Sequence, residues 1–430
     1  MAKILEVLAR SVWDSRGRPT VEVEIAVKGT GRTAATAVGR AIAPAGASTG
    51  SGEAKSIDVK EAVRMVNTEI RSLLTGKNLD QESIDHALIA LDGTPDKSRL
   101  GGNAIVAVSL ASAHAAAAAA KKPLWKFLAG DRVVAMPVPQ IQIFGGGAHA
   151  HGSMDVQDFM IICTGAGSFT ESLEWTAAIY QAAGARLAKR GALRGVADEG
   201  GYWPAFKSNE EALAELTGAI SDAGFEAGAD VGIALDIAAT QLWRGGRYHL
   251  ALEDRALTAA QLHSMLLGWI DRYPIVSIED PFAEHDMEAM ASFTRTAGSR
   301  IQVVGDDFFV TDAKKLKEGR IKGACNTVLL KPNQAGTLTE TLACWRAAQE
   351  AGYRAIVSAR SGETEDVSIV HLAVGWGVPQ LKVGSFARSE RMAKWNEGLR
   401  IEESLGGNKL SFPAGKLFNQ RGARPAPVRR

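Results

Sequence analysis

The sequence predicts an α/β protein of two domains, a small N-terminal α+β cap over residues 1–136 and a β/α barrel over residues 137–417. The length of 430 residues exceeds what one hydrophobic core usually supports. Near the N-terminus, Val21, Val23 and Ile25 alternate with glutamates, which is the period of a half-buried strand. In the second half, apolar runs that end in a polar or small residue alternate with amphipathic stretches, which is the pattern of βα units.

The apolar runs of the second domain are spaced as barrel strands would be. Their end residues are 23 to 43 positions apart, and one strand, one helix and two loops need about 25–35 residues. A closed barrel of the (β/α)₈ type is the fold that we expect, and an open doubly wound sheet is the alternative. The runs end at Asp236, Glu279, Asp306, Lys331, Ala359 and Lys382.

Three other segments are interpreted from their composition. The alanine-rich stretch 104–120 is interrupted by two serines and a histidine, so we expect a packed helix rather than a membrane span. Residues 44–50 are rich in glycine, serine and threonine and predict a surface loop. Residues 418–430 are basic, contain two prolines and predict a disordered tail.

The charge balance argues against two classes of partner. The 49 lysines and arginines nearly cancel the 48 aspartates and glutamates, which leaves a net charge of +1. A chain of this size with so little net charge has no overall field that would attract nucleic acid or an anionic membrane, so we expect neither. Cys163, Cys325 and Cys344 are far apart in the sequence, which favours buried thiols in a reducing compartment. Because the N-terminal residues contain no apolar core of signal-peptide length, we expect a cytoplasmic protein.

The predicted strand ends carry acidic side chains. Asp236, Glu279 and Asp306 end three successive runs, and strand ends converge on one mouth of a barrel. One such carboxylate would be an ordinary cap or salt bridge, but three that lie close together repel one another unless positive charge lies among them. Oxygen ligands favour Mg²⁺ or Mn²⁺ over zinc, so the sequence predicts a site for a divalent cation.

Lys331 and Lys382 end later runs and are expected beside this cation. A lysine that lies near positive charge and away from water has a lowered pKa and can act as a base. A divalent cation beside a basic lysine suits the removal of a proton next to a carboxylate, because the cation stabilises the enolate that forms.

Seven motifs of the chain resemble the enolase family. They extend from the N-terminus to residue 403 and cover nearly the whole chain. The resemblance implies an enolase-type barrel behind a cap, Mg²⁺ as the cofactor, a small phosphorylated hydroxy acid as the substrate, and a homodimer or larger homo-oligomer. The motifs are residues 14–23, 91–94 with 97–98, 198–201, 277–282, 333–334, 360–366, and 388–391 with 400–403.

The resemblance also implies roles for residues that would hold metal or move the proton. Asp236, Glu279 and Asp306 would bind the catalytic Mg²⁺. Ser48 would help to hold a second Mg²⁺ that arrives with the substrate. Lys331 would remove the C2 proton of the substrate.

Other matched residues would act on the rest of the substrate. Lys382 would bind its carboxylate, and Glu199 would help the C3 hydroxyl to leave as water. Arg360 and Ser361 would grip the phosphate, a task that suits the geometry of a guanidinium. His149 lies in a glycine-rich segment that resembles the mobile loop that closes over the substrate in this family.

Two positions depart from the family pattern. Asp158 follows Gln157, which we expect to contact the substrate, and stands where enolases have a glutamate near the leaving hydroxyl. The loss of one methylene withdraws the carboxylate by about 1.5 Å, and a displacement of roughly 1 Å can cost on the order of 100-fold in rate. Ala359 stands where enolases have a histidine beside the phosphorus group. His151 is the nearby histidine that could replace it, although a solvated loop residue is the simpler interpretation.

Three functions remain open on the sequence. The first is enolase-type dehydration of a phosphorus-modified 2-phosphoglycerate analogue, such as a carboxyphosphonoglycerate that gives carboxyphosphonoenolpyruvate in phosphonate biosynthesis. The second is the glycolytic conversion of 2-phosphoglycerate to phosphoenolpyruvate. The third is a non-catalytic enolase fold that serves as a binding protein. The space at Ala359 favours the first over the second, and the retained carboxylates and lysines argue against the third.

Overall fold

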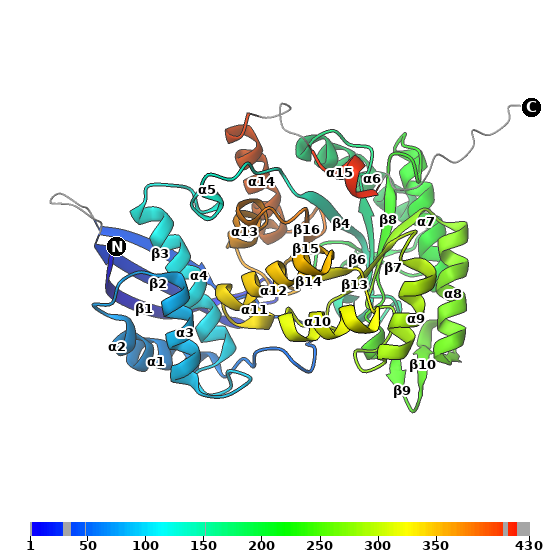
Figure 1. Cartoon of the computed structure of the whole chain (residues 1–430). Helices are drawn as coiled ribbons and strands as arrows, with labels where there is room; N and C mark the ends of the chain where they lie inside the picture. The colour runs from blue at the N-terminus through cyan, green and yellow to red at the C-terminus, as the bar shows by residue number, and fades with distance from the viewer. Residues whose placement is uncertain (1, 29–35, 48, 151, 407–411, 419–430) are drawn as a thin grey trace, which may run out of the picture.

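The structure is a computed structural model that describes residues 2–28, 36–47, 49–150, 152–406 and 412–418. Within them the cap and the barrel are separate lobes that pack side by side, with the cap at the left of Figure 1. The predicted fold class is therefore confirmed. Most of the predicted tail, residues 419–430, lies outside the described residues.

The cap combines an antiparallel sheet with helices. Its strands β1 (Lys3–Trp13), β2 (Pro19–Lys28) and β3 (Thr36–Ile42) are paired in that order. The alternating valines and isoleucine of β2 are fully buried, as their period predicted. The helical segments are α1 (Val59–Met65), η1 (Val66–Ile70), α2 (Arg71–Leu74), α3 (Gln81–Asp92), α4 (Gly102–Ala119) and α5 (Leu124–Ala129).

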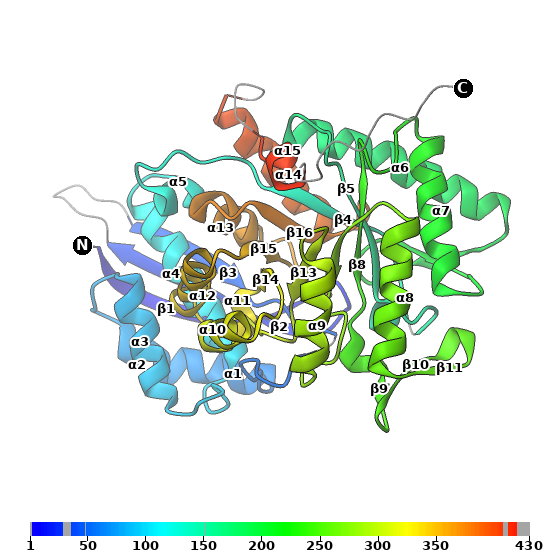
Figure 2. The same cartoon turned by 45° about the vertical axis from the view of Figure 1, so that its right-hand side comes forward.

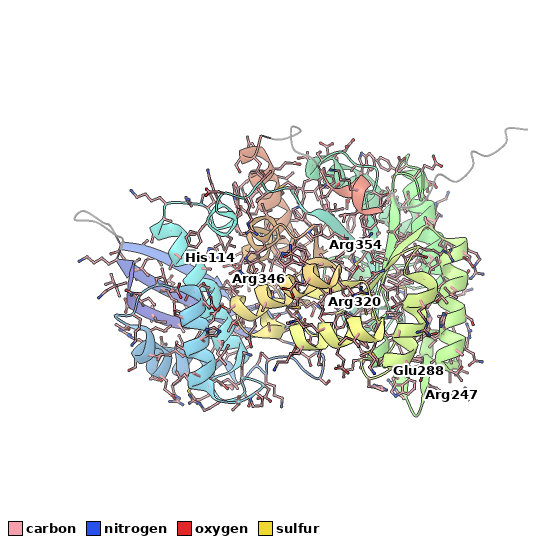
Figure 3. All side chains as sticks on the ribbon, in the orientation of Figure 1. His114, Arg247, Glu288, Arg320, Arg346 and Arg354 are labelled. Carbon is pink, nitrogen blue, oxygen red and sulfur yellow. The ribbon has the colours of Figure 1, made fainter. Side chains whose placement is uncertain are left out.

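The alanine-rich helix α4 is the core helix of the cap. A Cβ atom at Gly39 of β3 would lie 2.1 Å from the backbone nitrogen of Ala115, so helix and sheet approach more closely than a larger side chain would allow. By length and composition alone α4 could cross a membrane, but 78% of it is buried inside the fold, as expected for a packed helix. His114, labelled in Figure 3, extends from α4 to the barrel helix α13 (Ser368–Trp376), where its Nε2 lies 2.8 Å from Ser368 Oγ.

Eight strands form a closed barrel. The first and last strands pair, with Gln380 opposite Val138, which excludes the open sheet. Figure 2 shows the strands enclosed by helices. Around the barrel the strands are β4 (Val138–Gly145), β5 (Asp158–Ile162), β8 (Gly232–Asp236), β12 (Ile275–Glu279), β13 (Gln302–Gly305), β14 (Thr327–Leu330), β15 (Arg354–Ser358) and β16 (Gln380–Gly384).

The barrel differs from a plain (β/α)₈ order at its second strand. β5 follows β4 after the short turn η2 (Gly147–Ala150) and runs antiparallel to both of its neighbours, β4 and β8. Asp158, the first residue of β5, therefore lies opposite Asp236, the last residue of β8. The reversed strand brings Asp158 to the same mouth as the carboxylates at the ends of the parallel strands.

Helices and short strands complete the second domain. The larger helices are α6 (Phe169–Lys189), α7 (Asn209–Asp222), α8 (Ala259–Arg272), α9 (Met287–Ala297), α10 (Ala313–Lys322), α12 (Leu338–Ala351), α13 and α14 (Ser389–Ser404). The hairpin β6 (Leu193–Val196) and β7 (Tyr202–Pro204) extends the sheet from β4, and β9 (Trp243–Arg244), β10 (Arg247–Leu250) and β11 (Arg255–Leu257) form a small sheet. The short helix α15 (Ala414–Phe418) packs against Val138, Met160 and Ala234 of the barrel strands.

Two cap segments lie over the mouth of the barrel. Ala45 and Gly362 exchange backbone hydrogen bonds of 2.9 and 2.8 Å, and Ser15 donates its backbone N–H to the Glu363 carbonyl at 2.7 Å. Ala54 donates its backbone N–H to the Gln334 carbonyl at 2.8 Å. The loop predicted over residues 44–50 is therefore anchored to the barrel at Ala45.

Candidate active site

The structure brings the predicted site residues together at the carboxyl ends of the barrel strands. One pocket there is lined by nine of them, and Asp158, Glu279 and Asp306 contact its lysines directly. Ser48 and His151 lie outside the described residues. The nine are His149, Gln157, Glu199, Asp236, Lys331, Ala359, Arg360, Ser361 and Lys382.

Lys382 lies among three buried carboxylates. Its Nζ is 2.8 Å from Glu279 Oε2, 3.1 Å from Asp236 Oδ2 and 3.6 Å from Asp158 Oδ2. Burial lowers the pKa of the Lys382 ammonium, but the charges of Asp236 and Glu279 outweigh it and raise this pKa well above the usual value. Gln157 Nε2 also donates to Asp236 Oδ2, at 3.1 Å.

One observation shows that the predicted metal ligands fit a divalent cation, namely an oxygen atom of Glu279 that is unpaired among the described residues. Glu279 is fully buried, and its Oε1 has no hydrogen-bond partner among the described residues. Burial and the charge of the neighbouring Asp236 raise the pKa of Glu279 well above its usual value. A buried acceptor without a partner, in a set made only of carboxylate oxygens, fits a hard cation such as Mg²⁺.

Lys331 is paired with one of the predicted metal ligands. Lys331 forms an ion pair with Asp306. Burial lowers the pKa of its ammonium, but Asp306 outweighs burial and raises the pKa above the usual value. The lowered pKa was expected for a lysine beside a bound cation, and that expectation stays a prediction.

A second acidic group lies beside Asp306 and was missed from the sequence. Asp280 follows Glu279 with a positive φ of 40°, and its two carboxylate oxygens accept the backbone N–H groups of Asp306 (2.9 Å) and Asp307 (2.7 Å). Burial and the charge of Asp306 raise the pKa of Asp307 to about 7. The three carboxylates offer oxygen atoms within 4.8 Å of one another. Asp280 stands in one of the quoted motifs, which was the available signal.

His149 bridges two carboxylates at another side of the mouth. Its Nδ1 is 2.9 Å from Asp158 Oδ1, and its Nε2 is 3.7 Å from Glu199 Oε1. Burial lowers the pKa of His149, but Asp158 and Glu199 outweigh it and raise the pKa to about 9. At neutral pH the group is thus an imidazolium between two carboxylates. The shorter Asp158 side chain still reaches His149, and Gln142 Nε2 donates to the same oxygen of Asp158.

Arg360 and Ser361 come shortly after the end of β15 and line the same pocket. The Arg360 guanidinium is paired with Glu53 of the cap, a residue that sequence reasoning missed. Ser361 Oγ accepts the backbone N–H of Ala47 at 2.6 Å. Ala359 is 6% exposed and is one of the residues that line the pocket. Ala359 is the first residue after β15, and its backbone N–H donates to the Lys382 carbonyl of β16 at 2.8 Å.

The fold and the site define a class of protein, a two-domain barrel enzyme with buried carboxylates and lysines at one mouth. Comparison with known proteins identifies the family. Residues 4–128 match the family model "Enolase, N-terminal domain", and residues 133–420 match "Enolase, C-terminal TIM barrel domain". The chain is 46% identical to "Enolase 1" of Desulfitobacterium hafniense (strain Y51) over 435 aligned positions that cover 98% of each chain. The chain therefore belongs to the enolase family, a family of hydro-lyases.

Proposed function

We propose that the protein is a magnesium-dependent dehydratase that removes the C2 proton and the C3 hydroxyl of an acid of the 2-phosphoglycerate type. The observation that carries this proposal is the meeting of three buried carboxylates with Lys331 and Lys382 at one pocket. A protein that only binds a partner would gain nothing from burying so many charges in contact.

Lys331 and Lys382 have different roles at the carboxylate end of the substrate. Lys331 takes the C2 proton as a neutral amine. Lys382 stays protonated, because three carboxylates surround it, and its charge faces the substrate carboxylate. When held by Asp236, Glu279 and Asp306, Mg²⁺ would stabilise negative charge on that carboxylate and weaken the pairing of Asp306 with Lys331. Ser48 is proposed to help hold a second Mg²⁺ that arrives with the substrate.

The cluster of His149, Asp158 and Glu199 serves the leaving hydroxyl. An imidazolium that contacts both carboxylates can supply a proton to Glu199, and Glu199 passes a proton to the departing oxygen, which leaves as water. Asp158 holds His149 in its charged form. Arg360 and Ser361 hold the oxygens on phosphorus at the other side of the pocket, and Gln157 orients Asp236.

Two substrates are candidates, and each has an observation in its favour. The identity of 46% to a relative named Enolase 1 favours 2-phosphoglycerate, and hence the glycolytic reaction. The small side chain of Ala359, which lines the pocket, favours an acid with a larger or differently charged substituent on phosphorus, of which a carboxyphosphonoglycerate is one. The comparisons lend no support to the second candidate, which therefore rests on Ala359 alone.

A direct assay decides between them. The purified protein is given 2-phosphoglycerate with Mg²⁺, and the absorbance of the enol product is followed against a metal-free control. Turnover near about 10 s⁻¹, as in typical enzymes, supports the glycolytic reaction. Turnover far below this value that rises sharply in Ala359→His with Asp158→Glu supports the modified substrate. Absence of turnover with any such acid, in a protein that binds Mg²⁺, would contradict the dehydratase proposal.

Three further proposals concern the whole chain. The domain boundary at 136/137 is supported by the family matches, which end at 128 and begin again at 133, and by β4, which begins at Val138. We also propose a cytoplasmic homodimer or larger homo-oligomer, which light scattering after gel filtration would test. A mass equal to the 45.5 kDa of one chain would contradict the oligomer.

A further inference from the structure

Glu53 is a buried acidic residue of the cap that reaches the mouth of the barrel. Its side chain is 6% exposed. Its position is fixed on both sides, because Gly50 donates its backbone N–H to Glu53 Oε1 at 3.0 Å and Ala54 donates to the Gln334 carbonyl at 2.8 Å. A carboxylate that is carried from one domain into the site of another requires partners, since burial without them is costly.

The first partner of Glu53 is Arg360. The guanidinium donates from Nη1 to Oε2 at 2.8 Å and from Nη2 to Oε1 at 3.1 Å, which is a bidentate pair. Nη1 also donates to Asn333 Oδ1 at 3.2 Å. A bidentate pair fixes both the position and the plane of a guanidinium. Glu53 therefore sets the orientation in which Arg360 meets an anion in the pocket.

The second partner of Glu53 is Gln334, which links Glu53 to Asp306, the partner of Lys331. Gln334 Nε2 donates to Asp306 Oδ1 at 2.9 Å and to Glu53 Oε1 at 3.3 Å. Its Oε1 accepts the hydroxyl of Thr311 at 2.7 Å, so the amide nitrogen must face the two carboxylates. The other oxygen of Asp306 pairs with Lys331. An unbroken chain of contacts thus runs from Arg360 through Glu53, Gln334 and Asp306 to Lys331.

We propose that Glu53 is a positioning residue for the reaction, which orients Arg360 at one side of the pocket and, through Gln334, the pair of Asp306 and Lys331 at the other. Glu53 acts through these groups, since it is not among the described residues that line the pocket. The inference rests on the proposed function, which takes Arg360 as the anion-binding group and Lys331 as the base. The competing explanation is that Glu53 only fastens the cap to the barrel.

Two variants and one matched control separate these explanations. Glu53→Gln removes the charge but keeps the length, and Glu53→Asp keeps the charge but withdraws it by about 1.5 Å. The control is Glu340→Gln, because Glu340 of α12 pairs with Lys97 of the cap at 3.0 Å, outside this pocket. The measurements are the melting temperature, KM and kcat for the better substrate, and the dissociation constant of inorganic phosphate by calorimetry.

The positioning role predicts a kinetic loss that the control does not share. Both Glu53 variants should raise KM and lower kcat, with a combined loss of about 100-fold in kcat/KM, and should weaken phosphate binding about 10-fold or more. Glu340→Gln should lose stability alone. If the Glu53 variants keep the wild-type KM, kcat and phosphate affinity and lose only melting temperature, the proposal is overturned.

Phosphate binding keeps this test separate from the proposed reaction. If the wild-type protein dehydrates neither substrate, the proposed function fails, but weaker phosphate binding by the Glu53 variants would still support the link between Glu53 and Arg360. The link to Lys331 is tested by hydrogen exchange at C2 of the substrate. Glu53→Gln, Gln334→Leu and the double variant should lose similar amounts of exchange, because they break one chain of contacts. Losses that multiply in the double variant would overturn that link.

Discussion

Replacing Asp158 by asparagine should lower the pKa of His149 strongly. The imidazole Nδ1 lies 2.9 Å from Asp158 Oδ1 in a fully buried cluster, and the neighbouring carboxylates raise the pKa of His149 to about 9. With an effective dielectric constant of about 20, unit charges at 2.9 Å attract by about 6 kcal/mol, or about 4 pKa units. Glu199 remains at 3.7 Å, and the asparagine carbonyl still accepts a hydrogen bond. We therefore expect the pKa of His149 to fall by about 2 units or more, to about 7 or lower.

Nuclear magnetic resonance of protein labelled with ¹⁵N in its histidine rings measures this shift. The chain has eight histidines, and the signal of His149 is assigned by its loss in His149→Gln. The control is Asp222→Asn, which removes an exposed carboxylate of α7. If the pKa of His149 remains near 9 in Asp158→Asn, the assignment of Asp158 as the group that holds the imidazolium is refuted.

The ion pair of His149 with Asp158 should stabilise the folded protein at low and neutral pH and lose this effect at alkaline pH. The folded pKa of His149 lies above the unfolded value of about 6.5, so its contribution is complete below about pH 6.5 and is lost as the pH rises through about 9. The difference of about 2.5 pKa units between the folded and unfolded states corresponds to about 3 kcal/mol in the free energy of unfolding. Urea unfolding at several pH values should show this loss in the wild-type protein and a smaller one in Asp158→Asn. Equal pH profiles of the two proteins would contradict the argument.

Three further predictions concern other buried groups. Lys331→Gln should slow hydrogen exchange at C2 of the substrate by about 100-fold or more, because the base is lost, and wild-type exchange would contradict that role. Glu279→Gln should weaken Mg²⁺ binding by about 100-fold in calorimetry, since it removes the buried unpartnered oxygen, and unchanged affinity would exclude it as a ligand. Burial lowers the pKa of His371 to about 4, so urea unfolding should show up to about 3 kcal/mol lost between about pH 6.5 and 4. His371→Gln should abolish this loss, and an unchanged profile would contradict it.

The sequence was most informative where a residue's position depends on local periodicity. Asp236 and Glu279 could be assigned to strand ends because the apolar runs before them are short and buried on all sides. The reversed direction of β5 could not be read in this way, because pairing with β4 and β8 is set by contacts between distant segments. For the same reason Glu53 was missed, as its partner Arg360 is 307 positions away in the chain. The ion pair of Lys331 with Asp306 was also not foreseen, because residue types alone do not say which charge contacts which.

The two departures from the family pattern differ in how far the structure compensates for them. Asp158 retains contacts with His149, Gln142 and, at 3.6 Å, Lys382, so the shorter side chain is still held in its cluster. Ala359 has only a methyl group to offer the pocket, and among the described residues that line it His149 is the one histidine, already engaged with Asp158. The chemistry of proton removal and hydroxyl departure can therefore be retained while the phosphorus side changes. Ala359→His therefore tests the proposed choice between the two substrates more sharply than any change at Asp158.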